Sequence, residues 1–139
     1  MMYISSTMKT NVLVADDDMD VQQLMCDVLE ISLRNVKVER ALSLPVFWSK
    51  LPAPPDMPWH LVVLSAEYIK EEPAGFMERF TAANPDAVGR FVIVGTAAEA
   101  ADMESYAESA GESVKSVPFL IKPFSLEGFE ELVKQVCGQ

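Results

Sequence analysis

Short runs of consecutive apolar residues recur along the chain, and most of them end at a polar side chain. These runs occupy residues 12–15, 36–41, 61–64, 91–94 and 119–121. A short, continuous apolar run is typical of a strand that is buried on both faces of a parallel sheet. The run 36–41 instead alternates between apolar and polar residues. That alternation predicts a strand with one more exposed face.

Between these runs, apolar residues are spaced as they are on one face of a helix. The first such stripe follows Asp18, which can cap the helix, and it contains Val21, Leu24, Met25, Val28, Leu29 and Ile31. Further helices are predicted through Phe47, Trp48 and Leu51 (with Ser43 as N-cap) and over residues 75–83, 97–110 and 125–136. A proline-rich loop, residues 52–58, leads into the third strand. Strands that alternate with helices predict an α/β fold, with a parallel sheet and helices on both of its faces.

Composition fits one cytoplasmic domain. Of the 139 residues, 50% are hydrophobic, which fills one core, and we expect a flexible N-terminal segment (1–10) before a domain over 11–139. The net charge of −10 argues against nucleic acid or an anionic membrane as partner, because few basic residues are available to neutralise phosphates. No apolar stretch has the length of a membrane span or a signal-peptide core. Cys26 and Cys137 are expected to be reduced and partly buried.

The polar residues that end the predicted strands are candidates for chemistry. Asp16 and Asp17 follow the first strand, Ser65 the third, Thr96 the fourth and Lys122 the fifth. In a doubly wound sheet, the functional crevice lies at the carboxyl ends of the strands, so these side chains should converge. Adjacent carboxylates repel each other and need a cation, either Mg²⁺ or the Lys122 ammonium. We therefore predict an ion pair between Lys122 and Asp16 or Asp17, with Ser65 nearby.

From residue 11 to residue 137 the chain resembles the response-regulator receiver domains of two-component signalling. The resemblance implies a flavodoxin-like sheet with strand order 2-1-3-4-5, and a cis Lys122–Pro123 bond. It assigns Asp16 and Asp17 as metal-binding acids, and Glu67 as a metal ligand through its carbonyl. It assigns Thr96 as the hydroxyl that senses the phosphoryl group and Lys122 as the ammonium that pairs with this group. Phe119 would be the aromatic switch residue, and Gly75-Phe76 the start of the third helix.

The chain departs from the receiver pattern where the chemistry is most demanding. Ser65 replaces the aspartate that accepts the phosphoryl group. A serine hydroxyl is neutral and needs a general base. His60 lies at the other end of the same strand, where we expect a solvated residue. Tyr68-Ile69 stands in place of Met-Pro, Met19 in place of a proline, and the loop to Gly75 is longer. Asp16, Asp17 and Glu67 should form at most a weak residual Mg²⁺ site, so no cofactor is required.

These features favour an atypical receiver, or pseudo-receiver, that is not an enzyme and signals by protein–protein interaction without aspartyl phosphorylation. The expected partner is a histidine kinase or a downstream effector. The resemblance also implies a homodimer or partner surface on the face formed by helix 4, strand 5 and helix 5. Two alternatives stay open: a phosphorelay receiver that accepts phosphate on an unconventional residue such as Glu67 or Asp18, and a small-ligand module that uses the acidic crevice. Thr96 can also serve as a helix N-cap, and Trp48 and Trp59 are expected to be packing residues.

Overall fold

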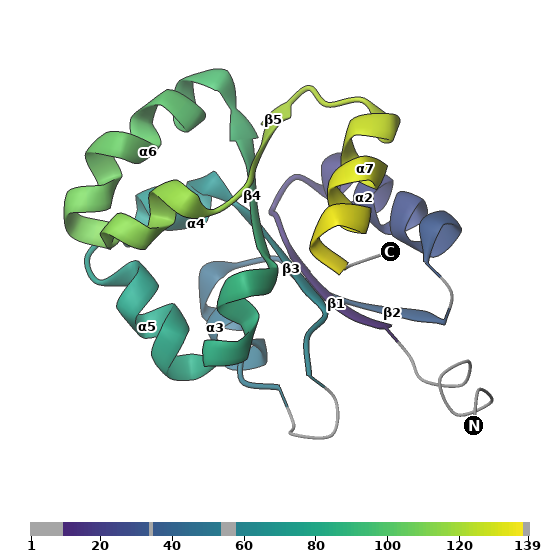
Figure 1. The fold of residues 1–139 in the computed structure, drawn as a ribbon, viewed down its shortest axis with the longest axis horizontal. Helices are drawn as coiled ribbons and strands as arrows, with labels where there is room; N and C mark the ends of the chain where they lie inside the picture. Colours follow the sequence, from purple (N-terminus) through teal and green to yellow (C-terminus); the bar gives the residue numbers. More distant parts are fainter. Residues whose placement is uncertain (1–9, 34, 54–57, 138–139) are drawn as a thin grey trace.

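A five-stranded parallel sheet forms the centre of the protein. The computed structural model describes residues 10–33, 35–53 and 58–137. The strands are β1 (Thr10–Ala15), β2 (Val36–Ala41), β3 (Leu61–Ser65), β4 (Phe91–Thr96) and β5 (Phe119–Lys122), in the order β2-β1-β3-β4-β5 (Figure 1). The predicted doubly wound α/β fold and its strand order are therefore confirmed. Of the predicted N-terminal segment, residues 1–9 lie outside the described residues, and Thr10 already belongs to β1.

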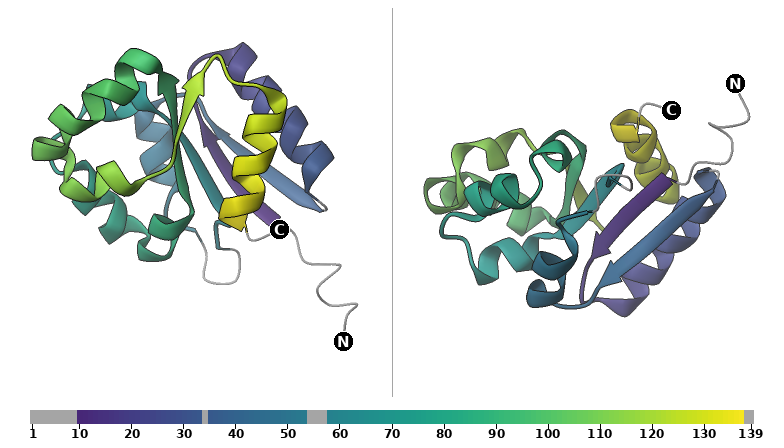
Figure 2. Two further views of the ribbon diagram at one scale, coloured as in Figure 1. Left: turned by 45° about the horizontal axis from the view of Figure 1, so that its top comes forward. Right: turned by 90° about the horizontal axis from the view of Figure 1, so that it is seen from below.

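Helices cover both faces of this sheet. The helices are α2 (Met19–Ser32), α3 (Leu44–Lys50), α4 (Ala66–Glu71), α5 (Phe76–Ala83), α6 (Ala97–Ala110) and α7 (Leu126–Cys137), with 3₁₀ turns η1 (Pro85–Arg90) and η2 (Glu112–Ser116). Figure 2 shows α2 and α7 together on one side, and α3, α4, α5 and α6 on the other. The two faces carry different numbers of helices because each connection between parallel strands places its helices on one face only.

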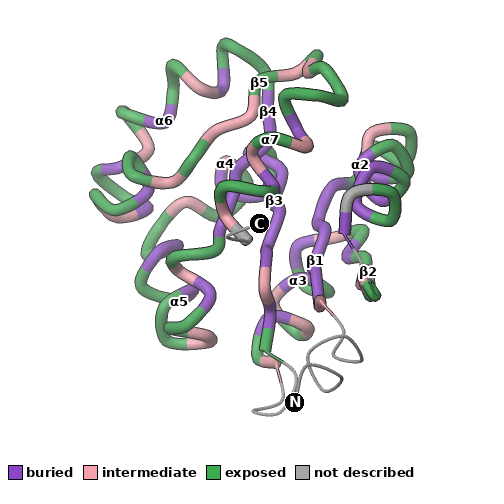
Figure 3. Tube along the Cα trace, turned by 45° about the vertical axis from the view of Figure 1, so that its right-hand side comes forward, coloured by how far each residue is buried: buried purple, intermediate pink, exposed green. Residues whose placement is uncertain are grey.

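Two apolar cores result from the alternation of side chains along the strands. Val12 and Val14 of β1 pack beneath α2 and α7, while Leu13 and Ala15 pack toward the α3 to α6 side. Figure 3 shows that β1 and β3 are buried along nearly their whole length, whereas the edge strand β2 is more exposed. The carboxyl end of this sheet is the end where polar side chains accumulate.

The predicted helix caps at the start of α2 and α3 are confirmed. The Asp18 carboxylate accepts hydrogen bonds from the backbone N–H groups of Asp20 and Val21, and the Ser43 hydroxyl accepts one from Val46. Each bond satisfies a donor that has no partner within its own helix.

Two predictions about the helices were wrong. Residues 66–71 form α4, where a longer loop was expected, because Ser65 caps a helical turn whose apolar residues Tyr68 and Ile69 are buried. The apolar stripe of α2 is also narrower than predicted, since Ile31 is 83% exposed. Ile31 lies about 160° around the helix from the fully buried Leu29, so the sheet does not cover it.

The remaining expectations concern single side chains. Cys26 is a buried free thiol, and burial raises its pKa above the usual value; the Cys137 side chain lies outside the described residues. Trp59 donates a hydrogen bond to the Leu51 carbonyl and Trp48 packs edge-on against Phe47, so both tryptophans pack as predicted. Across the described parts of the chain, none of the helices combines the length and the apolar character that crossing a bilayer requires.

Candidate functional site

A group of polar side chains at the carboxyl end of the sheet, which we call the acidic crevice, is built around Asp16, the residue that follows β1. Asp16 is only 1% exposed. Its Oδ2 accepts a hydrogen bond from Lys122 Nζ at 3.0 Å, and its Oδ1 accepts one from the Asp18 backbone N–H at 2.9 Å. The predicted ion pair is therefore confirmed and involves Asp16. The Lys122–Pro123 peptide bond is cis, as the resemblance implied.

Asp17 and Asp18 differ from Asp16 in their surroundings. Asp17 is exposed, and Asp18 is occupied as the N-cap of α2. The three consecutive acids thus have three roles: one buried ion-pair partner, one exposed charge and one helix cap. Three identical residues in the sequence cannot show which one takes which role, because the roles depend on how the chain turns from β1 into α2.

Gln22 is a buried member of the site that the sequence did not indicate. Its amide Nε2 donates to the backbone carbonyl of Asp16 at 3.0 Å and lies 3.5 Å from that of Val14. These contacts hold the first turns of α2 against the end of β1. In the sequence, only the position of Gln22 next to Val21, at the edge of the apolar stripe, could have indicated its burial.

Ser65 lies beside Asp16, at the end of the neighbouring strand. The register pairs Ala15 with Leu64, so the residues that follow each of them end adjacent strands. Ser65 is 1% exposed, and its Oγ accepts a hydrogen bond from the Glu67 backbone N–H at 3.3 Å, which makes it the N-cap of α4. Its hydroxyl therefore has a structural role as the cap of α4.

Tyr68 is another buried member of the site. In the sequence it stood out only as a departure from the receiver pattern. Its side chain is buried, and its hydroxyl finds no hydrogen-bond partner among the described residues. Burial raises the pKa of Tyr68 well above its usual value, and the negative charges of Asp17 and Asp16 raise it further. The phenol is thus neutral, and it brings aromatic bulk close to the acidic pair.

Thr96 is committed to the start of α6. Its Oγ1 accepts from the Glu99 backbone N–H at 3.1 Å, and Glu99 Oε1 accepts from the Thr96 backbone N–H at 2.9 Å. This reciprocal pair is a capping box. The role of Thr96 as an N-cap is confirmed, and its hydroxyl is already bonded within the protein.

Glu99 also links α6 to α4 through Lys70. The Lys70 Nζ lies 3.2 Å from Glu99 Oε2. Burial alone would raise the pKa of Glu99, but the hydrogen bonds from the Thr96 backbone and from Lys70 outweigh burial and hold the pKa below its usual value. Glu99 is therefore a buried, ionised carboxylate. Neither this residue nor Lys70 was predicted, although the Thr-x-x-Glu spacing was visible in the sequence.

Gly95 makes this arrangement possible. A Cβ at Gly95 would lie 2.7 Å from Glu99 Oε1, 2.9 Å from the Ala66 Cβ and 3.0 Å from the Phe119 ring. The absence of a side chain lets the Glu99 carboxylate, the start of α4 and the Phe119 ring approach one point. Phe119, the expected switch residue, consequently packs inward, partly buried against the core on the α6 side.

The residues present do not make a complete Mg²⁺ site. Glu67 lies in the first turn of α4, so its carbonyl points along the helix axis, and its side chain lies 3.8 Å from Lys70. Both oxygens of Asp16 are already hydrogen-bonded. Among the residues that the structure describes, no three His, Cys, Asp or Glu side chains are grouped as metal ligands would be. Mg²⁺ prefers an octahedron of oxygen ligands that often includes carboxylates, and this crevice offers only a fragment of one.

His60 lies at the opposite end of β3, far from Ser65. The backbone N–H of Asn11 donates to His60 Nδ1 at 3.0 Å, and the pKa of the imidazole is lowered by burial and by the charge of Arg90. The expectation of a simply solvated residue was therefore incomplete, because the ring joins the pairing of β1 with β3. His60 cannot act as a base for Ser65 from there.

Solved structures show what this architecture resembles. A response regulator from Thermotoga maritima superposes with a TM-score of 0.70 at 19% identity, over 95% of this chain and 100% of that one. The receiver domain of NtrX from Brucella abortus gives a TM-score of 0.61 at 16% identity, over 92% and 98% of the two chains. The chain has the receiver fold. No family model matches the sequence, and no curated protein matches it as a relative.

A third structure agrees with the first two. The chemotaxis response regulator CheY4 of Vibrio cholerae gives a TM-score of 0.62 at 15% identity, over 93% of this chain and 99% of that one. Identities this low establish the fold and leave the function to the site itself.

Proposed function

We propose that this protein is a pseudo-receiver, a signalling module that acts by binding a protein partner without aspartyl phosphorylation. The observation that carries the proposal is the burial of Ser65, whose hydroxyl caps α4. By the resemblance to receivers, Ser65 takes the place of the phosphoryl acceptor. A receiver needs an anionic oxygen at this place, in line with the phosphorus of the donor. A neutral hydroxyl that caps a helix does not provide one, and His60 lies at the other end of β3.

The other receiver-like groups support the same proposal, because each already has an internal partner. Lys122 is paired with Asp16, and the Thr96 hydroxyl accepts a hydrogen bond from the Glu99 backbone. The Tyr68 hydroxyl has no partner among the described residues, but the side chain lies near the acids. An incoming phosphoryl group would have to break these contacts. We infer that the crevice holds one conformation and does not switch by phosphoryl transfer.

The protein would then work through its surface, as a cytoplasmic partner of a histidine kinase or a downstream effector. One face for such contacts, or for a homodimer, is formed by α6, β5 and α7. Exposed apolar residues lie on it at Ile121 of β5 and Leu126 of α7. Contiguous exposed apolar patches mark interaction sites, and we propose that Ile121 and Leu126 contribute to one.

Incubation with acetyl phosphate and Mg²⁺ at neutral pH, followed by intact mass measurement, tests the proposal. We expect no added phosphoryl group on the wild-type protein. A phosphoryl group that disappears in Glu67→Gln or Asp18→Asn, and remains in Ser65→Ala, would establish the phosphorelay alternative instead. Asp18→Asn can still cap α2, so its loss of labelling would not reflect unfolding.

A further inference from the structure

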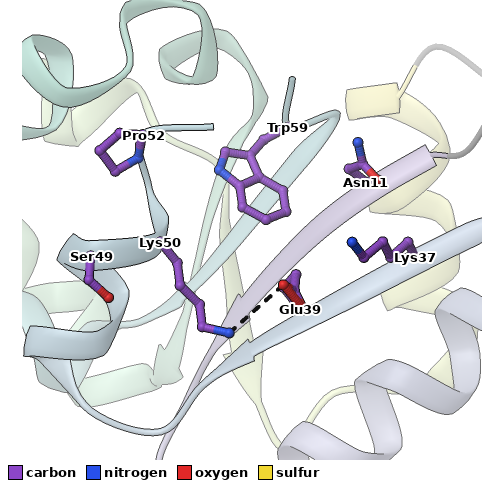
Figure 4. Close-up of a pocket in the computed structure, with 7 residues that line it drawn as sticks. All are labelled: Asn11, Lys37, Glu39, Ser49, Lys50, Pro52 and Trp59. Carbon is purple, nitrogen blue, oxygen red and sulfur yellow. Dashed lines mark ion pairs between the residues drawn. The ribbon is translucent and has the colours of Figure 1, made fainter. Parts of the chain in front are cut away.

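A cavity of about 280 Å³ lies at the end of the sheet opposite the acidic crevice. Its lining includes Asn11 of β1, Lys37 and Glu39 of β2, Lys50 of α3, and Pro52 and Trp59 from the connection between α3 and β3 (Figure 4). Asn11 pairs with Lys37 in the sheet register, and Leu13 pairs with Glu39, so the side chains of Asn11, Lys37 and Glu39 share one face of the sheet.

Asn11 supplies a buried acceptor that the fold leaves unused. Its side chain is 5% exposed. The amide nitrogen lies 3.5 Å from the Pro58 carbonyl, while Oδ1 is buried and has no hydrogen-bond partner among the described residues. Native proteins rarely leave a buried polar atom unpaired, because its desolvation is costly. An N–H group on a bound molecule would satisfy this oxygen.

The charge of the cavity differs from that of the whole protein. The chain carries a net charge of −10, yet two lysines and one glutamate line this cavity. Lys50 and Glu39 are 3.9 Å apart, with side chains 35% and 40% exposed, so their pairing is weak and Lys50 can turn toward another anion. Lys37 is exposed on the edge strand. The site therefore favours a ligand with a negative group.

Trp59 supplies the apolar surface. Its indole N–H is fixed by the Leu51 carbonyl at 2.9 Å, so what the side chain offers the cavity is aromatic carbon. Figure 4 shows the indole between Lys50 and Asn11, with Pro52 on the side away from Asn11. Aromatic side chains favour contact with flat rings.

We propose that this cavity binds a small aromatic anion whose ring carries an N–H donor, and that a purine nucleotide is the class of ligand that fits. The base would contact Trp59 and donate to Asn11 Oδ1, and the phosphate would lie against Lys37 and Lys50. The five residue steps from Asn11 to Asp16 span about 16 Å of extended strand. This site is thus separate from the acidic crevice and does not depend on the pseudo-receiver proposal.

Calorimetric titration with guanosine monophosphate tests the binding. We expect saturable binding with a Kd below about 1 mM, and binding of guanosine or inorganic phosphate that is at least about tenfold weaker. Lys37→Glu should weaken the nucleotide at least about tenfold. Lys115→Glu is the matched control, since it changes the net charge equally but lies in η2, where Lys115 pairs with Glu112 at 3.1 Å; it should leave the affinity unchanged.

A measurement on the wild-type protein keeps the test independent of the variants. The indole N–H signal of Trp59 should shift on addition of guanosine monophosphate, and that of Trp48 should not. Absence of saturable binding up to about 10 mM would overturn the proposal. Equal weakening by Lys37→Glu and Lys115→Glu would overturn it too, as would inorganic phosphate binding as tightly as the nucleotide.

Discussion

Replacement of Lys122 by methionine should destabilise the protein through the charge of Asp16. Methionine keeps an unbranched, flexible side chain but removes the ammonium. Asp16, which is 1% exposed, would then keep its hydrogen bond from the Asp18 backbone N–H but would lose its counter-charge. A buried carboxylate without a partner is costly because it has lost its hydration.

The exposure of the two side chains sets the size of the effect. Breaking a fully buried ion pair costs about 3–5 kcal/mol, whereas an exposed pair contributes about 0–1 kcal/mol. Asp16 belongs to the first class, but the Lys122 side chain is 21% exposed. We therefore expect Lys122→Met to lower the free energy of unfolding by about 2–3 kcal/mol.

Urea unfolding followed by circular dichroism at neutral pH measures this loss. Asp16→Asn combined with Lys122→Met should recover more than half of it, because the double variant leaves no buried charge. Lys134→Met is the control, since Lys134 and Glu130 are 3.8 Å apart with side chains 46% and 39% exposed, and it should cost less than about 0.5 kcal/mol. A Lys122→Met loss as small as that of the control would refute the reasoning.

Three further substitutions test the rest of the crevice. Ser65→Asp places another carboxylate beside Asp16, so the variant should be less stable than wild type without metal and should gain thermal stability from Mg²⁺. Glu99→Gln should lower the free energy of unfolding by about 1 kcal/mol at pH 7. Because the pKa of Glu99 is lowered in the folded protein, its carboxylate stabilises the fold above about pH 4.3, and this stabilisation is lost as the pH falls through the folded pKa. The acid unfolding curve of the variant should lack this loss of stability. Gly95→Ala should cost about 1–3 kcal/mol in urea unfolding because its Cβ meets three close neighbours.

Each of these has a matched comparison. Ser65→Asn can still cap α4 without adding a charge, so an equal Mg²⁺ response in both Ser65 variants would show that the new carboxylate is not the ligand. If Glu99→Gln and wild type lose stability in parallel on acidification, Glu99 is not the group that titrates. Gly89→Ala adds a Cβ with no atom within 4 Å and should be close to neutral; a similar loss at both glycines would contradict the close contacts at Gly95.

The sequence alone determined the sheet, its helices except α4, and the place of the acidic crevice. Apolar runs mark buried parallel strands, and the carboxyl ends of parallel strands meet at one edge of the sheet. The sequence alone therefore predicts that four residues lie close together: Asp16, Ser65, Thr96 and Lys122. The Asp18 and Ser43 caps were also predictable, because a cap bonds to backbone groups only two or three residues away.

Tertiary structure decided which of these side chains are already occupied. The Lys70–Glu99 pair joins residues 29 positions apart. The burial of Tyr68 near Asp16 and Asp17 depends on residues 66–71 folding as a helix against the core. The unpaired oxygen of Asn11 likewise appears only when β1 and the segment before β3 are side by side. Side-chain partners across elements are set by packing, distance and desolvation in three dimensions, and periodicity along the chain carries none of that information.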